Sequence, residues 1–212
     1  ILETGTWNGG RAIEMALASF KNQDSVHYIG FDLFEDATIH TDHAEFNVKP
    51  HNTMEAVEKR FAEFAEHMKE KEDKTFTYEL TKGNVRETLD KFVKTEALDE
   101  VDFALMGSGN SIETTQVEYE AFKNIPVVVI DHYFTKESDE DESMPPEKYH
   151  GAKNVFDSVK TKMVDTEEKD TEGWTIFEEE DSVRKYILPS QDKVAGGGHT
   201  HLCLFLHDTK LE

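Results

Sequence analysis

Apolar and polar positions alternate along this chain with two periods, one typical of strands and one typical of helices. Strands are predicted for runs rich in β-branched and aromatic residues: "ILETG", "SVHYIGFDLF", "TFTYELTKG", "VDFALMG" and "PVVVIDHYF". The segment from Thr53 to Glu70 instead spaces its large apolar residues three or four positions apart: Met54, Val57, Phe61, Phe64 and Met68. That spacing predicts an amphipathic helix whose apolar face packs in the core.

Helical patterns also separate the other strands, at residues 11–21, in "NVRETLDKF" and in "SIETTQVEYEAFKN". Repeated alternation of strand and helix implies an open, mostly parallel sheet with right-handed crossovers. We therefore expect a doubly wound α/β domain. Three more strand candidates follow, "WTIFEEED", "VRKYILPS" and "HTHLCLFLHD", and "QDKVAGGG" joins the last two in a hairpin-like connection.

Two segments interrupt this alternation. Residues 36–52 contain several histidines but little apolar pattern, and residues 135–150 form an acidic, proline-containing stretch before a helical pattern near 151–163. We expect both to be loops inserted into one domain spanning residues 1–212, because no internal repeat or domain-splitting linker is visible. Loops at the carboxyl edge of such a sheet cover the pocket and set substrate choice.

Charge narrows the range of partners. The 212 residues include 45 acidic and 23 basic ones, a formal net charge of -22. Such a surface repels phosphate backbones and anionic lipid, so we expect neither nucleic acid nor membrane as a partner. No apolar stretch approaches the roughly 20 residues that cross a bilayer, and no signal peptide is visible. A cytoplasmic protein is expected, with its single cysteine, Cys203, buried in the core.

The first strand runs into a turn that contains Gly5, Gly9 and Gly10, and Asp32 ends the second strand 22 residues after Gly10. Glycines at the carboxyl end of a strand let a ligand approach the backbone, and a carboxylate at the end of the second strand accepts hydrogen bonds from ribose hydroxyls. A dinucleotide site favours G-x-G-x-x-G, because pyrophosphate lies on the helix N-terminus. Here Glu3 precedes the turn, which favours a cationic sulfonium or amino group over pyrophosphate.

The stretch "LETGTWNGGRAIEMA", followed by "YIGFDLFE", resembles the first two motifs of class I S-adenosylmethionine-dependent methyltransferases, and the resemblance spans nearly the whole chain. Within that superfamily the chain is most similar to small-molecule methyltransferases, sugar O-methyltransferases among them. Their fourth strand ends in D-G-x-H-S-x-E and their fifth in D-D-Y. The resemblance implies a Rossmann-like, mostly parallel sheet of seven strands whose last strand is antiparallel, and "HTHLCLFLHD" suits that strand.

The resemblance also assigns roles to individual residues. It places four residues around the methionine part of S-adenosylmethionine, one just before the opening turn and three in it: Glu3, Gly5, Thr6 and Gly9. It places Asp32 on the ribose and brings Gly83 and Asn84 near the adenine. Asn84 also fits a purely structural role as a helix N-cap, and the two roles are compatible.

The catalytic half of the family pattern is altered. Gly107 stands where the family has Asp, Asn110 where it has His, and His132 where it has the second acidic residue after Asp131. In metal-assisted members these carboxylates hold a divalent cation that orients and acidifies a substrate hydroxyl, so the changes weaken a metal site. His132 is then the candidate base, with Asp131 beside it. The alternative is that both residues only end a strand.

Three histidines near the end of the chain raise a separate question. His199 and His201 alternate on the last predicted strand and share a face, and His207 lies further along. Nothing in their spacing fixes a metal site, and a solvent-facing or pocket-edge pair is the simpler expectation.

Ser111 and Glu113 are expected to start a helix, as N-cap and first-turn residue.

The first functional hypothesis is methyl transfer from S-adenosylmethionine to a hydroxyl or similar nucleophile of a small molecule. The second is a methyltransferase-fold protein that binds the cofactor or a metabolite without transfer, which the altered positions favour. The third, a nicotinamide-dependent oxidoreductase, is disfavoured by Glu3 and by the missing third spaced glycine. The sequence leaves a divalent metal and a homo-oligomer as open questions.

Overall fold

The structure is a computed structural model that describes residues 1–45, 47, 49–95, 98–134, 150–159, 175–178, 183–193 and 199–207. Its helices are α1 (Gly10–Ser19), α2 (Ile39–Ala44), α3 (Met54–Glu72), α4 (Val85–Thr95), α5 (Ile112–Phe122) and α6 (His150–Ser158), with short 3₁₀ turns at Phe34–Asp36 and Leu98–Glu100. Its strands are β1 (Leu2–Thr4), β2 (Ser25–Asp32), β3 (Thr75–Lys82), β4 (Phe103–Met106), β5 (Val127–Phe134), β6 (Thr175–Glu178), β7 (Val183–Lys193) and β8 (His199–His207).

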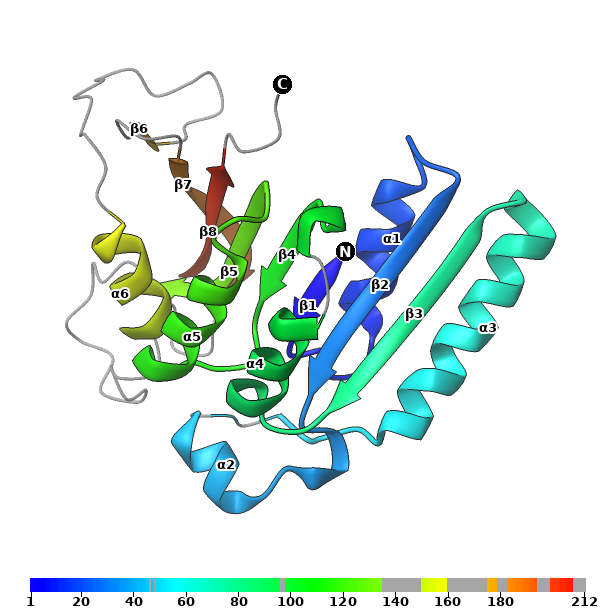
Figure 1. The fold of residues 1–212 in the computed structure, drawn as a ribbon, viewed down its shortest axis with the longest axis horizontal. Helices are drawn as coiled ribbons and strands as arrows, with labels where there is room; N and C mark the ends of the chain where they lie inside the picture. Colours follow the sequence, from blue (N-terminus) through cyan, green and yellow to red (C-terminus); the bar gives the residue numbers. More distant parts are fainter. Residues whose placement is uncertain are drawn as a thin grey trace.

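The strands form a single mixed sheet in the order β3-β2-β1-β4-β5-β8-β7-β6 (Figure 1). Strands β1 to β5 are parallel to their neighbours in this set, and β8 pairs antiparallel with β5. The predicted α/β class and the antiparallel last strand are confirmed. Within the described residues the sheet has eight strands, because β6 adds an antiparallel edge strand to β7 beside the seven strands that the resemblance implies.

Helices cover both faces of the sheet, which confirms the doubly wound architecture. The alternation of side chains in β2 shows how the two cores separate. Tyr28 packs with α1 and α3 on one face, and Phe31 packs with α4 and α5 on the other. The predicted apolar face of α3 lies in the first core, where Val57 and Phe61 are buried. Cys203 is buried in the second core, as expected.

Residues 36–52, predicted as a loop, contain a short helix. α2 begins after Thr38, whose hydroxyl accepts a hydrogen bond from the Thr41 backbone N–H in a capping box. No residue of α2 is buried. A helix that packs no face on the core needs no apolar stripe, which explains why the sequence pattern did not reveal it. The arrowheads of β2 and β3 point toward α2 in Figure 1, which places this helix at the carboxyl edge of the sheet. The predicted loop at 135–150 lies outside the described residues, except for its last residue.

Strand order reverses at β1, which lies between β2 and β4. The crossover from β1 to β2 runs through α1 on one face, and the helix that precedes β4, α4, lies on the other. The loops after β1 and β4 therefore diverge, and a crevice opens between them. In open α/β sheets this is where ligands bind.

Candidate functional site

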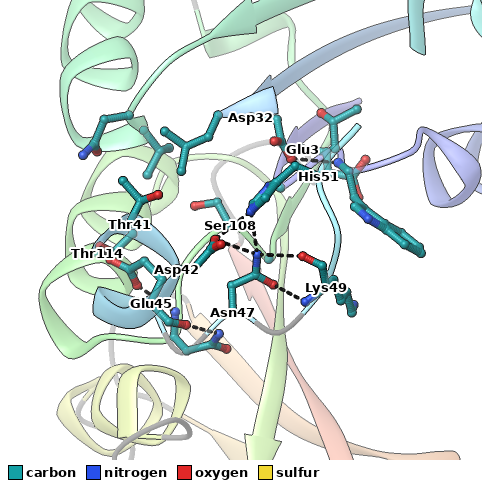
Figure 2. A pocket seen from close by; sticks show the side chains of 18 of the residues that line it. Glu3, Asp32, Thr41, Asp42, Glu45, Asn47, Lys49, His51, Ser108 and Thr114 are labelled. Carbon is teal, nitrogen blue, oxygen red and sulfur yellow. Dashed lines mark hydrogen bonds and ion pairs between the residues drawn. The ribbon is translucent and has the colours of Figure 1, made fainter. Parts of the chain in front are cut away.

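A pocket of about 270 Å³ lies at the carboxyl ends of β1, β2 and β4. One side is formed by the glycine turn after β1 and by the ends of β2 and β4, and the other side by the segment around α2 (Figure 2). The residues assigned to the cofactor that line it are Glu3, Gly5, Thr6, Asp32, Gly83 and Asn84. The topology thus brings together residues that lie up to 81 positions apart in the sequence, from Glu3 to Asn84.

The glycine turn has a backbone that only glycine adopts easily. Gly5 has φ of 82°, and a Cβ atom on it would lie 2.5 Å from the carbonyl oxygen of Gly107. Gly5 N–H donates to the Phe31 carbonyl oxygen at 2.8 Å, which fixes the turn against β2. Gly9 is not among the pocket-lining residues; it is the N-cap of α1, with φ of 74°, and packs against the Phe61 ring. The turn is therefore packed closely on two sides, against the main chain at Gly107 and against the Phe61 ring.

Asp32 ends β2 and fixes the backbone around the pocket. Its Oδ2 accepts from Trp7 N–H at 2.8 Å, and its Oδ1 accepts from Phe34 N–H at 2.7 Å. Trp7 and Phe34 both have positive φ, near +50°, a strained conformation for residues other than glycine. Each carboxylate oxygen has capacity for a second hydrogen bond. Asp32 is therefore able to hold the turn and still accept hydrogen bonds from two ligand hydroxyls.

Glu3 is a buried carboxyl group beneath the turn, with 1% of its surface exposed. The Tyr28 hydroxyl donates to its Oε2 at 2.6 Å and lies 3.0 Å from the Thr6 hydroxyl. Burial raises the pKa of Glu3 to about 7, and the hydrogen bond from Tyr28 and the charge of Arg11 oppose that rise only in part. A cationic group bound in the pocket would favour the ionised form of Glu3. This buried acid is the feature that fits a sulfonium or an ammonium group.

Asp131 forms an ion pair with Arg11, and both charges act on Glu3. Arg11 Nη1 lies 2.9 Å from Asp131 Oδ2, and the side chains are 40% and 14% exposed. The same Nη1 atom would lie 3.4 Å from a Cβ at Gly107, so the guanidinium lies beside the position where the family has Asp. Arg11 lines the pocket and Asp131 does not. These residues do not fit a divalent cation, because a guanidinium already neutralises the carboxylate.

His132 lies in β5, where the pairing register with β8 shifts between Ile130 and Tyr133. Its side chain is outside the described part of the structure, and so are those of His199 and His201 in β8. His207, at the end of β8, is buried, with 4% of its surface exposed. Among the described residues, no group of three His, Cys, Asp or Glu side chains is arranged to hold a metal ion.

Asn84 has the structural role considered from sequence. Its Oδ1 accepts from Arg86 N–H at 3.0 Å at the start of α4, and it also lines the pocket. Ser111 likewise caps α5, because its hydroxyl accepts from Thr114 N–H at 3.2 Å. Glu113 follows in the first turn of α5, as expected.

Sequence reasoning missed several polar residues of the site. Ser108 lines the pocket and donates to Glu118, a fully buried carboxyl on α5 whose pKa is raised to about 7 by burial. The sequence contained a signal for a buried Glu118, because it is spaced three positions from Thr115 and four from Phe122, which are also buried.

Asp42 and His51 also line the pocket, with 2.6 Å between Asp42 Oδ1 and His51 Nε2 (Figure 2). Their pairing depends on the path of the chain around α2, which no periodicity predicts.

The sequence matches no protein-family model and no curated protein. Among solved structures, the chain is similar to the O-methyltransferase TomG from Streptomyces achromogenes, which is involved in tomaymycin synthesis and was solved in complex with SAM. The similarity has a TM-score of 0.55 at 15% sequence identity and covers 97% of this chain and 71% of that one. No helix in the described part of the chain is long and apolar enough to span a membrane. This structural similarity shows that the chain has the Rossmann-like methyltransferase fold.

Proposed function

We propose that this protein transfers a methyl group from S-adenosylmethionine to a hydroxyl or similar nucleophile of a small molecule. The observation that carries the proposal is the position of two carboxyl groups in one pocket. Glu3 lies buried beneath the glycine turn, and Asp32 stands at the end of β2. The first suits the cationic end of the cofactor and the second suits its ribose. The SAM-bound state of the structural neighbour supports the same choice of cofactor.

In this proposal, the residues of the chain bind and orient. Glu3 faces the positive charge, Thr6 and Gly5 bound the methionine part, and Asp32 accepts from the ribose hydroxyls. Asn84 lies beside the adenine, next to Gly83, whose N–H donates to the Asp32 carbonyl oxygen at 2.9 Å. When bound, the cofactor supplies an electrophilic methyl group on its sulfonium. The protein then needs to place a nucleophile in line with it, which is mainly a matter of positioning.

The acceptor proton needs a destination. We assign this role to His132 in β5, with Asp131, the partner of Arg11, beside it in the chain. The Arg11–Asp131 ion pair holds the side chain of Asp131, the neighbour of His132 in the chain, and Arg11 itself lines the pocket. A base is required only when the acceptor is a hydroxyl of high pKa.

The first experiment is calorimetric titration of the protein with S-adenosylmethionine, S-adenosylhomocysteine and NAD, each with and without Mg²⁺. We expect both sulfur nucleosides to bind, NAD not to bind, and Mg²⁺ to change neither result. Incubation with S-adenosylmethionine and a panel of sugars and other hydroxyl compounds, read by mass spectrometry, then tests transfer. Binding without transfer to any acceptor supports the binding protein without catalysis, and absence of binding contradicts the proposed function.

A further inference from the structure

The segment after β2 forms one wall of the pocket. We call the described residues of this stretch, 38–45, 47 and 49–51, the roof segment. The members of this segment that line the pocket are Thr41, Asp42, Ala44, Glu45, Asn47, Lys49 and His51. In Figure 2, Thr41, Asp42, Glu45 and Asn47 lie on one side of the view and Glu3 and Asp32 on the other, with His51 between them. A ligand in the pocket is therefore covered by this segment.

Glu45 connects the roof segment to the N-terminus of α5. Its Oε2 accepts from the backbone N–H groups of Asn110 and Ser111, each at 3.0 Å. These N–H groups lie where a helix leaves donors without internal partners and where the helix dipole favours negative charge. The Glu45 side chain is only 16% exposed. The carboxylate thus occupies an enclosed position at the start of a neighbouring helix.

Side chains complete this position. Glu45 Oε1 accepts from the hydroxyls of Thr114 at 2.6 Å and Ser111 at 3.1 Å, and Arg86 Nη2 lies 3.3 Å away. Gly109 leaves room for the carboxylate, since a Cβ there would lie 2.7 Å from Glu45 Oε2. The Glu45 carboxylate thus accepts five hydrogen bonds, and Gly109 leaves the space that it occupies. Such a contact is more specific than an ion pair between two exposed side chains.

The rest of the roof segment has few other anchors. α2 buries no residue, and Ile39 is 83% exposed. Within the described residues of 38–47, the hydrogen bonds to elements outside the segment all come from Glu45. Further along, Trp7 Nε1 donates to the Pro50 carbonyl oxygen at 2.8 Å. Segments with few buried apolar contacts open most easily, so a single polar anchor has a large effect on them.

We propose that Glu45 is a positioning residue that latches the roof segment over the pocket, and that ligand exchange requires release of this latch. The proposal rests on the proposed function only for the choice of probe, which is S-adenosylhomocysteine. Release of Glu45 from α5 frees α2 and the pocket-lining residues on either side of it. The latch therefore governs how fast a ligand enters and leaves, more than how the ligand is recognised.

The test compares Glu45→Gln with Glu113→Gln. Glutamine at 45 replaces one acceptor oxygen with an NH₂ group, which faces donors and breaks part of the latch. Glu113 also pairs with Arg86, at 2.9 Å, but its side chain is 78% exposed and it is not one of the donors to Glu45, so its variant is a matched control for the loss of a carboxylate beside Arg86. We expect dissociation of S-adenosylhomocysteine, followed by stopped-flow tryptophan fluorescence, to be at least tenfold faster in Glu45→Gln and within twofold of the parent in Glu113→Gln.

Hydrogen exchange of the unliganded protein provides a readout that needs no ligand. The amides of Asp42 and Glu45, which bond within the roof segment, should exchange at least tenfold faster in Glu45→Gln, while those of α3 stay unchanged. Faster exchange there supports the latch even when no ligand binds, an outcome that contradicts only the proposed function. Unchanged exchange, or unchanged dissociation of a ligand that does bind, overturns the latch.

Discussion

The Tyr28 hydroxyl donates a hydrogen bond of 2.6 Å to the buried Glu3 carboxyl group. The Tyr28 hydroxyl has one proton, and it donates that proton to Glu3. In the 3.0 Å contact between the Tyr28 and Thr6 hydroxyls, Thr6 is therefore the donor. The three side chains thus form one directed chain that runs from the glycine turn, through β2, back to β1. These hydrogen bonds fix the Glu3 carboxyl group beneath the pocket. The oxygen atoms of Glu3 still have capacity to accept a hydrogen bond from a ligand.

This relationship predicts a pH dependence of ligand binding. Glu3 has a pKa of about 7, so it is neutral below pH 7 and must lose a proton to face an ammonium group. Affinity for S-adenosylhomocysteine should therefore rise about tenfold between pH 6 and pH 8 and level off above that. In Glu3→Gln the binding should be weaker at pH 8 and flat across this range, as measured by calorimetry. An unchanged slope in the variant would assign the proton to another group.

Asp32→Ala should reduce the affinity for S-adenosylhomocysteine at least a hundredfold, or about 3 kcal/mol. The change removes the acceptor for ribose hydroxyls and also the two hydrogen bonds to Trp7 and Phe34 N–H. Asp36→Ala is the matched control, because Asp36 is exposed and pairs only weakly with Lys82, at 3.4 Å. Equal binding by the parent and Asp32→Ala would show that the ribose lies elsewhere.

Gly5→Ala should destabilise the fold and impair binding together. The new Cβ would meet the Gly107 carbonyl oxygen at 2.5 Å and would sit on a residue with φ of 82°. We expect a loss of at least about 2 kcal/mol in the free energy of unfolding, measured by urea denaturation. Gly10→Ala, at the first position of α1, is the control and should change stability by less than about 1 kcal/mol. Similar losses in both variants would contradict the tight packing of β1 against β4.

Glu118→Gln should change the pH dependence of stability. The folded pKa of Glu118 is raised to about 7 from 4.5, so the folded chain holds this proton more tightly than the unfolded chain does. The stability contributed by the neutral form is present below pH 4.5 and is lost as the pH rises toward 7, by up to about 3 kcal/mol. Glutamine cannot ionise. The melting temperature of the variant relative to the parent should therefore rise by several degrees between pH 5 and pH 8.

Glu120→Gln serves as the control for that experiment, because Glu120 is exposed on the same helix and pairs with Lys123. Its melting temperature should follow that of the parent at both pH values. Glu3 contributes the same trend to every one of these proteins, so it cancels in the comparison. A constant difference between Glu118→Gln and the parent across the pH range would mean that Glu118 is already ionised in the fold.

The fold could be predicted from sequence because its elements have strong periodic patterns. The spacing of Val57, Phe61 and Met68 marks the buried face of α3, and the β-branched run after Pro126 marks β5. The meeting of Glu3 and Asp32 in one pocket could also be predicted, since the carboxyl ends of parallel strands lie at the same edge of a sheet. These signals are local or depend only on strand topology.

The rest of the site depends on contacts that no periodicity encodes. Glu45 accepts a hydrogen bond from the backbone N–H of Asn110, which lies 65 positions later in the sequence. Arg11 in α1 forms an ion pair with Asp131 in β5. Which polar residues of an irregular segment form hydrogen bonds depends on the path of the backbone in the folded structure, and local sequence does not specify that path. Sequence reasoning placed this segment over the pocket but gave no reason to choose Glu45 among its many polar residues.

The close approach of Gly5 to the main chain at Gly107 has a consequence for redesign. Where the floor of a binding site is backbone, substitution cannot reshape it without breaking the fold. The variable surface of this pocket is the opposite wall, where Thr41, Asn47 and Lys49 stand on a segment with no buried helix face. Altered ligand preference should therefore be sought by exchanging residues of that wall, while the glycine floor is left as it is.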